Sequence, residues 1–202
     1  MSPTRSKPVN SRPRPSASGA PNRLRIIGGR WRGVRITFPD HAELRPSPDR
    51  VRETLFNWLQ PVTLEARCLD LFAGSGVLGI EALSRGAAEV VLVEKDARTV
   101  RNIEETLRRL DATGATVRQA DALKYLDTPP EKFFTLVFLD PPFAAGLLPE
   151  VFGKLARNGW LAPGALIYVE APASAPLPPL PATWVVHRSG QAGQVGYHLL
   201  RS

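Results

Sequence analysis

Four acidic side chains in this sequence each follow a short apolar run: Asp70, Glu94, Asp121 and Asp140. A carboxylate next to a hydrophobic core costs free energy unless a partner or a ligand neutralises it. Four such acids at the ends of successive strands are therefore hard to explain by packing alone. Because open α/β sheets bind ligands beyond the carboxyl ends of their strands, these acids predict a ligand site at one sheet edge.

The last of these acids opens the tetrapeptide Asp140-Pro141-Pro142-Phe143. Two prolines cannot continue a strand, so the chain must leave the sheet here. The Asp140 carboxylate and the Pro141 carbonyl are hydrogen-bond acceptors, and Phe143 offers a flat apolar face. An exocyclic amine on a nucleobase has two N–H donors and a ring that stacks, so it matches these three groups. An isolated Asp-Pro-Pro is more often a plain turn, but a glycine-rich stretch upstream favours the chemical interpretation.

That glycine-rich stretch lies between a predicted strand and a predicted helix, just after Asp70. Its G-x-G-x-x-G motif consists of Gly74, Ser75, Gly76 and, further on, Gly79. Glu94 follows at the end of the next predicted strand, and this pairing is typical of nucleoside binding. NAD is the obvious rival ligand, but Asp70 is unfavourable beside a pyrophosphate. It is favourable beside an ammonium and a sulfonium, which S-adenosylmethionine (SAM) carries.

Asp121 allows two interpretations of equal weight. Its carboxylate could accept the 6-amino group of adenine, or it could cap the short helix that follows it.

The elements that must position these acids alternate along the chain. Strands are predicted over 67–71, 89–94, 116–120, 136–139 and 165–170, with helices over 77–84, 97–110 and 147–156. Such alternation predicts an α/β fold with a doubly wound, mostly parallel sheet. After a Pro-rich connector over 171–181, runs at 184–187 and 195–200 predict an antiparallel hairpin with 188–194 as its loop.

Three parts of the chain are expected. Residues 1–23 hold almost nothing apolar and predict a disordered basic arm. Residues 24–60 are expected to form an extension with two strands, over 24–27 and 34–38, followed by a helix. Ser47 is the predicted N-cap of this helix, Pro48 its first residue, and Pro61 the residue that ends it. Residues 61–202 form the main domain.

The positive charge is concentrated near the N-terminus. Residues 1–58 hold 12 Lys/Arg and 4 Asp/Glu, whereas residues 59–202 hold 14 and 15. This asymmetry predicts a polyanionic partner that approaches from the N-terminal side. On the loop between the first two strands, Arg30, Trp31 and Arg32 could pair phosphates and stack a base, or Trp31 could cover the edge of the core.

Other features limit the possibilities. The single cysteine, Cys68, excludes an intramolecular disulfide and is expected to be a small core residue. The three histidines are scattered, so no metal site is expected. No apolar run has membrane-spanning length and no secretory signal is apparent, which favours a reducing cytoplasm.

Taken together, the glycine motif, Glu94, Asp121 and the tetrapeptide from Asp140 resemble class I SAM-dependent methyltransferases that act on exocyclic amines. The stretches 25–33, 45–59 and 70–76 narrow the resemblance to the bacterial RsmD family, which methylates the N2 amine of one guanine in 16S ribosomal RNA. The resemblance covers about residues 24–200. Pro48 departs from it, because Thr or a similar residue is expected there.

The resemblance implies a role for each site residue. Asp70 with Gly74, Ser75, Gly76 and Gly79 would hold the methionine part of SAM. Glu94 would bind the ribose, and Asp121 the adenine. Arg50 and Thr54 would contact the cofactor carboxylate. Asp140 and Pro141 would orient the guanine amine, and Phe143 would stack on the base.

The resemblance also implies an RNA partner. The expected RNA contacts are Arg30, Trp31, Arg32, Arg35 and Arg188. The expected substrate is 16S rRNA within the 30S subunit or an assembly intermediate, and a monomer is the default state. The alternatives are a DNA amino-methyltransferase, which should carry a target-recognition insertion, and an RNA-binding protein that has lost catalysis.

Overall fold

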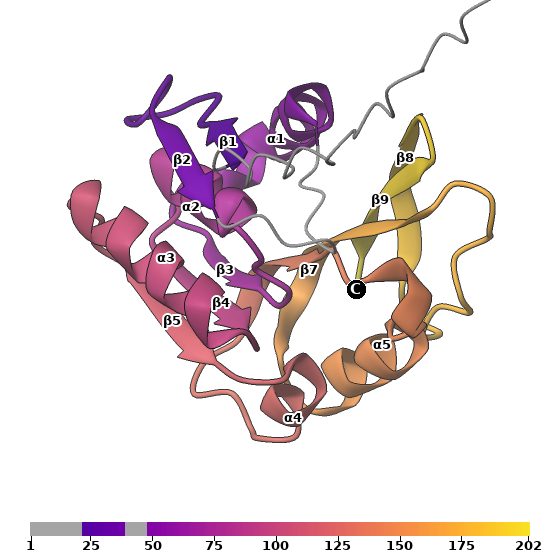
Figure 1. The fold of residues 1–202 in the computed structure, drawn as a ribbon. Coiled ribbons are helices and arrows are strands. Elements are labelled where there is room, and N and C mark those ends of the chain that lie inside the picture. Colours follow the sequence, from indigo (N-terminus) through magenta and orange to yellow (C-terminus); the bar gives the residue numbers. More distant parts are fainter. Residues whose placement is uncertain (1–21, 39–47) are drawn as a thin grey trace, which may run out of the picture.

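The computed structural model describes residues 22–38 and 48–202. At its centre lies a seven-stranded sheet of order β5-β4-β3-β6-β7-β9-β8 (Figure 1). Its strands are β3 (Arg67–Asp70), β4 (Glu89–Glu94), β5 (Ala115–Gln119), β6 (Phe134–Leu139), β7 (Leu161–Pro172), β8 (Val185–Ala192) and β9 (Val195–Arg201). The helices that connect them are α2 (Val77–Ser84), α3 (Ala97–Arg109), α4 (Ala122–Leu126), the 3-10 turn η1 (Phe143–Ala145) and α5 (Leu148–Arg157).

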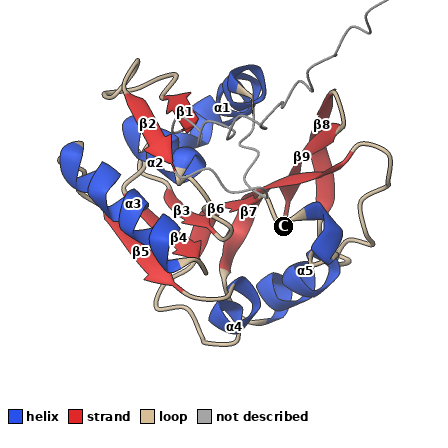
Figure 2. Cartoon of the chain, viewed as in Figure 1, coloured by secondary structure: helices blue, strands red, loops and turns tan. Residues whose placement is uncertain are grey.

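The sheet is the predicted doubly wound one. Strands β3 to β7 run parallel, and β9 and β8 join antiparallel to β7 and to each other. Helices cover both faces, with α1, α2 and α3 on one and α4 and α5 on the other (Figure 2). Cys68 and Leu69 are buried in different cores, because successive strand residues point to opposite faces. The predicted fold class is therefore confirmed.

The N-terminal extension consists of the antiparallel hairpin β1 (Asn22–Arg25) and β2 (Arg35–Phe38), followed by helix α1 (Asp49–Thr63). Strand β1 begins at Asn22, two residues before the predicted start at Leu24, and ends at Arg25. Residues 1–21 lie outside the described part of the chain, so the basic arm stays a prediction. The predicted N-cap, Ser47, also lies outside it. Pro48, predicted as the first helical residue, is the N-cap itself, so the helix begins one position later than predicted.

The prediction that Pro61 ends this helix is wrong, because α1 continues to Thr63. A proline inside a helix removes one N–H donor and crowds the carbonyl four residues earlier, but the residues after it can still adopt helical geometry. The hydroxyl of Thr63 donates to the Leu59 carbonyl at 2.8 Å and supports the last turn. The helix ends where Leu64 turns extended and Glu65 adopts a φ of 58°.

The C-terminal hairpin is longer than predicted. Strand β8 runs to Ala192, so the predicted loop over 188–194 is wrong, and only Gly193 and Gln194 connect β8 to β9. Gly190 pairs with Tyr197 across the two strands. A Cβ on Gly190 would lie 2.4 Å from the Tyr197 ring, so the ring occupies the space that a side chain at position 190 would need. This cross-strand contact keeps a glycine-containing stretch in the sheet.

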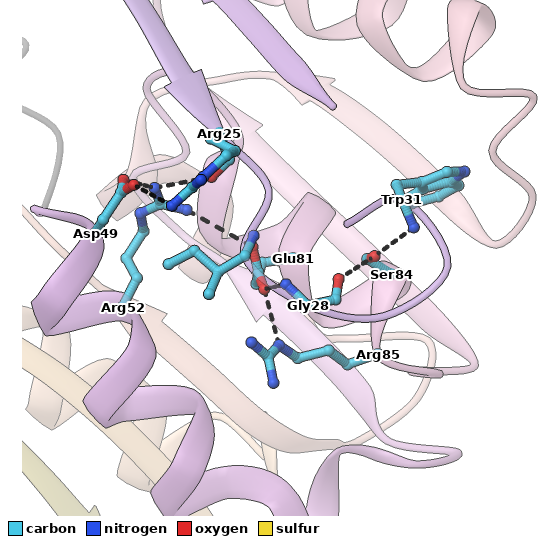
Figure 3. Close-up of polar contacts among 9 residues, drawn as sticks. Arg25, Gly28, Trp31, Asp49, Arg52, Glu81, Ser84 and Arg85 are labelled. Carbon is cyan, nitrogen blue, oxygen red and sulfur yellow. Dashed lines mark hydrogen bonds and ion pairs between the residues drawn. The ribbon is translucent and has the colours of Figure 1, made fainter. Parts of the chain in front are cut away.

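A buried ion network docks the extension on α2 (Figure 3). The fully buried carboxylate of Glu81 accepts the backbone N–H groups of Ile27 at 2.8 Å and Gly28 at 2.7 Å. It also accepts the Arg85 Nε–H at 2.8 Å, and Nη1 of the buried Arg52 lies 3.6 Å from its Oε2. The network thus joins α1, the hairpin loop and α2.

Gly29 brings the hairpin loop against the end of α2. Its φ is 74°, and a Cβ there would lie 1.8 Å from the Ser84 carbonyl oxygen, so only glycine fits. That carbonyl accepts the Arg30 N–H at 2.8 Å, and the Ser84 hydroxyl accepts the Trp31 N–H at 3.0 Å. The loop is therefore fixed at the carboxyl end of α2.

Of the helices in the described ranges, none has the length and apolar character needed to span a membrane.

Candidate active site

A cavity of about 1730 Å³ lies along the carboxyl edge of the parallel strands. It brings together most of the predicted catalytic and cofactor-binding residues. The predicted residues among its lining are Asp70, Gly74, Ser75, Glu94, Asp121, Asp140, Pro141 and Phe143. We call the part beside β3, β4 and β5 the cofactor half. The part formed by residues after β6, by β7 and by the β8–β9 turn is the acceptor half.

Asp70 lies at the base of the cofactor half. It is 2% exposed, and its Oδ2 accepts the Gly79 N–H at 3.0 Å across the glycine turn. Burial raises the pKa of Asp70 to about 7, and the nearby charge of Glu94 adds to the rise, while the Gly79 hydrogen bond opposes it. A cationic ligand would stabilise the ionised carboxylate and return this pKa toward its usual range.

The glycines of the turn serve geometry and packing. Gly74 and Gly76 have φ values of 51° and 75°, which other residues adopt at a cost. A Cβ on Gly79 would lie 2.9 Å from Leu92 Cδ2 and 3.0 Å from Val90 Cγ1, so this glycine lets α2 pack closely on β4. Of the four predicted motif residues, Gly74 and Ser75 line the cavity, whereas Gly76 and Gly79 pack against the core beneath it.

Glu94 holds the glycine turn to β4. Its Oε2 accepts the Gly74 N–H at 2.9 Å, and its Oε1 accepts the Asp96 N–H at 2.8 Å. A carboxylate oxygen can accept more than one hydrogen bond, so Glu94 retains capacity for the hydroxyls of a ribose. The binding role of Glu94 stays a prediction with suitable geometry.

Asp121 caps α4. Its Oδ1 accepts the N–H groups of Leu123 at 3.0 Å and Lys124 at 3.1 Å, which confirms the capping interpretation. Asp121 also lines the cofactor half, and the cap uses only one of its oxygens. The two interpretations are compatible, and the adenine contact stays a prediction.

The tetrapeptide from Asp140 stands between the two halves. Pro141 is buried, whereas Phe143, the first residue of η1, is 41% exposed and lines the cavity. Burial raises the pKa of Asp140 well above its usual range, and the charges of Glu170 and Asp70 raise it further. Three carboxyl groups therefore share one poorly solvated region.

Glu170 is a cavity residue that we did not predict as a site residue. It is 3% exposed near the end of β7 and lines the acceptor half. The available signal was the same as for the other four acids, because Glu170 follows the apolar run 165–169. No motif such as Asp-Pro-Pro accompanies it.

The predicted cofactor contacts on α1 do not line the cavity within the described ranges. Arg50 is exposed, and its carbonyl accepts the Thr54 hydroxyl at 3.0 Å. Their contact with a cofactor carboxylate stays a prediction.

The predicted RNA contacts are spread over the surface. Arg30, Trp31 and Arg32 lie at the Ser84 end of α2, whereas the cavity is at its other end. The Trp31 ring is partly buried against the core, and the Arg30 guanidinium lies 3.9 Å from its centroid. This arrangement favours the packing interpretation of Trp31, while its stacking on RNA stays a prediction.

Two further predicted RNA contacts lie elsewhere. Arg35 is exposed on β2, and its carbonyl accepts a hydrogen bond from Arg109 of α3 at 3.1 Å. Arg188 is in strand β8 instead of a loop, with its guanidinium 6.0 Å from the Trp58 ring. The acceptor half is instead bordered by Gln191 near the end of β8 and by Gly193 and Gln194 of the β8–β9 turn.

Cys68 is fully buried in β3, as expected of a small core residue. Burial raises the pKa of its thiol to about 12, and Asp70 adds to the rise. Within 22–38 and 48–202, no group of three or more His, Cys, Asp or Glu residues could hold a metal ion.

A parallel sheet with a glycine turn after β3, an acid after β4 and Asp-Pro-Pro-Phe after β6 defines the class I methyltransferase fold. The sequence matches a family described as Conserved hypothetical protein 95 over residues 24–201. It is 50% identical over 189 residues to ribosomal RNA small subunit methyltransferase D of Escherichia coli K12, covering 92% of this chain and 93% of that protein. The chain belongs to this family, the RsmD methyltransferases.

A second relative and a solved structure support the same family assignment. The protein of the same description from Haemophilus influenzae is 41% identical over 191 residues, covering 93% of this chain and 97% of its own length. The solved structure of the Escherichia coli protein yhhF is 48% identical, covers 89% of this chain and 98% of its own, and superposes with a TM-score of 0.83.

Proposed function

We propose that this protein transfers a methyl group from SAM to the exocyclic N2 amine of one guanine in 16S ribosomal RNA. One observation carries the proposal. Asp140, Pro141 and Phe143 open into the same cavity as Asp70 and Glu94. An amine-binding tetrapeptide and a nucleoside-binding turn thus meet at one sheet edge, and the family supplies the RNA substrate.

The cofactor half fits SAM. Asp70 is a buried acid whose described contact is a single backbone N–H, so a ligand ammonium would supply the missing positive charge. Glu94 would accept the ribose hydroxyls and Asp121 the adenine amine, with Gly74, Ser75, Gly76 and Gly79 forming the turn beside them. When bound, SAM supplies the methyl group and its leaving group.

The protein's own part in the reaction is positioning. The lone pair of the guanine N2 amine is delocalised into the ring, which makes the amine a weak nucleophile. The Asp140 carboxylate and the Pro141 carbonyl would accept its two N–H bonds and direct the lone pair toward the methyl carbon. Phe143, partly exposed over the cavity, would stack on the ring. Orientation and fixed dipoles of this kind lower a barrier without a covalent enzyme intermediate.

The RNA must present the guanine unstacked, because the amine has to leave its base stack to reach Asp140 in the cavity. The exposed arginines of the hairpin, Arg30, Arg32 and Arg35, and Arg188 on β8 would contact phosphates. A chain of this size has little surface for choosing one guanine unaided, so the proposed substrate is the 30S subunit or an assembly intermediate. The proposal places a monomeric enzyme in the cytoplasm.

The test is methyl transfer from labelled SAM to 30S subunits from cells that lack this gene, followed by mapping of the modified base. Wild-type protein should label one guanine N2. Asp140→Ala should lower the rate by about 10²–10³-fold, because a preorganised acceptor at the reacting amine is lost. Its binding of S-adenosylhomocysteine (SAH) should stay within about twofold of wild type. Label only on DNA or another RNA would contradict the proposed substrate, and binding without transfer to any nucleic acid would contradict the enzyme.

A further inference from the structure

An arginine–tryptophan pair lies close to the acceptor half of the cavity. The guanidinium of Arg188 on β8 is 6.0 Å from the centroid of the Trp58 ring on α1. Arg188 is exposed, whereas Trp58 is half-buried. Among the described residues, no hydrogen bond or ion pair engages the N–H groups of Arg188. The planar cation is thus supported by an aromatic ring and open to solvent.

Tyr197 of β9 holds the Trp58 ring in place. The centroids of the two rings are 5.5 Å apart at an interplanar angle of 38°, which is a favourable aromatic contact. Gly190, opposite Tyr197 in the register of β8 and β9, leaves room for the Tyr197 ring. Aromatic contacts therefore join α1 to the β8–β9 hairpin, and Arg188 lies at this junction. We call Arg188, Trp58 and Tyr197 the Arg188 platform.

Strand β8 leads from the platform to the cavity. Gln191, three residues beyond Arg188, lines the acceptor half. At about 3.4 Å per strand residue, these two positions are about 10 Å apart along β8. On its other side Tyr197 is paired with Glu170 of β7, which also lines the cavity. An RNA whose target base is in the acceptor half therefore passes the platform with the adjoining nucleotides.

A second arginine–tryptophan pair lies far from this region. Arg30 is 3.9 Å from the centroid of the Trp31 ring, at the Ser84 end of α2. The cavity is at the opposite end of that helix, where Val77 lines it. Of the two pairs, only the one that contains Arg188 borders the acceptor half.

A guanidinium group can contact RNA in two ways. Its N–H edge binds a phosphate, and its flat face stacks on a nucleobase. A phosphate contact needs the charge alone, whereas stacking needs the plane. An aromatic ring beneath the guanidinium restricts its orientation, so less conformational freedom is lost when a base stacks on the other face.

We propose that Arg188, supported by Trp58 and Tyr197, stacks on the base of a nucleotide next to the target guanine. The inference rests on the proposed function, because it adds a second base-binding position to the same RNA site. A guanine that leaves its stack to reach Asp140 deprives its neighbour of a stacking partner. The Arg188 platform replaces that partner, which offsets part of the cost of extracting the guanine.

Arg188→Lys separates the plane from the charge, because Lys keeps the cation and loses the flat face. With 30S subunits from cells that lack this gene, its KM should rise by about 5- to 50-fold, as expected for one lost base stack. The value of kcat and the affinity for SAH should stay within about threefold, since Asp140 and the cofactor half are untouched. The slope of KM against salt should not change, because the number of positive charges is the same.

Arg157→Lys is the matched control. Arg157 is an exposed arginine at the end of α5, which packs on the other face of the sheet, so its KM should change by less than about twofold. Arg188→Gln removes the charge as well as the plane. An unchanged KM in Arg188→Lys with a raised KM in Arg188→Gln would show a phosphate contact alone and would overturn the inference, as would an unchanged KM in both.

Trp58→Leu tests the support, because it removes the ring and keeps an apolar side chain against Tyr197. Its KM should rise in the same range as that of Arg188→Lys. The double variant should lose no more than about twofold beyond the more affected single variant, because each change disables the same platform. Factors that multiply would show that the two residues act independently and would overturn the platform. Thermal unfolding and SAH binding check that the variants are folded.

The base can also be removed in place of the arginine, which keeps the test independent of the folding of any Trp58 variant. Reconstituted 30S subunits on ligated 16S rRNA would carry an abasic nucleotide at each of the two positions on either side of the modified guanine in turn. At one position the wild-type KM should rise by about 5- to 50-fold, and Arg188→Lys should add less than about twofold to that rise. Losses that multiply at every position would overturn the inference. Absence of transfer to intact 30S subunits would instead contradict the proposed function itself, so the two failures are distinguishable.

Discussion

Two buried carboxylates contact helix α2, and the protein gives them different partners. Glu81, within the helix, accepts two backbone N–H groups from the hairpin and lies against Arg52 and Arg85. Asp70, at the other end, accepts one N–H from Gly79. A carboxylate that belongs to the scaffold is thus neutralised inside the protein. A carboxylate that lines the cavity is left to be neutralised by what binds there.

This difference has a cost in stability at the Asp70 end. In the unfolded chain the pKa of Asp70 should be near its ordinary value of 3.8, whereas the pKa in the folded protein is about 7. Between these values the unfolded state gains from ionisation and the folded state does not, so this group lowers stability as pH rises from about 4 to about 7. A bound cation removes that cost, so cofactor binding and folding are coupled through one side chain.

The largest expected effect comes from breaking the Glu81 network. Glu81→Gln should lower the free energy of unfolding by about 3–5 kcal/mol, because it removes the fully buried carboxylate that the Arg52 and Arg85 guanidinium groups face. Chemical denaturation at pH 8 measures this change. Glu150→Gln on α5, where the side chain is 57% exposed, is the matched control and should change stability by less than about 0.5 kcal/mol. Equal small changes in both variants would contradict the structural role of Glu81.

The second substitution should act in the opposite direction. Asp70→Asn removes the charge, while its amide oxygen can still accept the Gly79 N–H. The unliganded protein should become more stable by about 1–3 kcal/mol at pH 8, with the gain shrinking as pH falls toward 4. SAM binding, measured by calorimetry, should weaken by at least about tenfold. A less stable variant with unchanged SAM affinity would place Asp70 in the scaffold instead.

The third prediction concerns the pH dependence of SAM binding by the wild-type protein. SAM affinity should be constant above about pH 7.5 and should weaken below pH 7 by up to about tenfold per pH unit, because the ligand must displace the proton from Asp70. In Asp70→Asn this part of the pH dependence should disappear. A flat profile in wild type between pH 5.5 and 8 would show that another group meets the ammonium.

The smallest expected effect comes from the packing of α2 on β4, at Gly79 between the two buried carboxylates. Gly79→Ala should cost about 1–3 kcal/mol, because its Cβ would meet Leu92 Cδ2 at 2.9 Å and α2 would have to move off β4. Gly153→Ala in α5 is the control, since its Cβ would meet only the mobile end of Arg157 and should gain up to about 1 kcal/mol of helix propensity. Thermal unfolding of both variants checks the difference.

Local signals predicted most of the fold and much of the cavity. The switch from an apolar run to glycines to a helical period marks β3, the turn and α2, and each needs only a few neighbouring residues. The errors at Pro61 and Arg188 arise where contacts formed only in the folded chain override the usual preference of proline and glycine to end an element. Thr63 and its carbonyl partner prolong α1, and the Tyr197 ring keeps Gly190 in β8.

The omissions have the same cause. Glu81 stands in an ordinary helical position, and only the folded chain brings Arg52 of α1 to it. Glu170 follows an apolar run as Asp140 does, but β7 continues past it to Pro172, and no Asp-Pro-Pro motif marks it as a site residue. Sequence can show that a residue is an acid in a strand, but the parallel register of β6 and β7 decides which acid stands next to which.

The single cysteine makes opening of the central sheet measurable by thiol labelling. Cys68 is fully buried in the central strand β3, and its thiol has a pKa raised to about 12. An alkylating reagent therefore reacts only with molecules in which the strand has opened, and the labelling rate reports the population of that open state. Labelling with and without SAM would measure how much the ligand closes the whole sheet, with no engineered probe and no competing thiol.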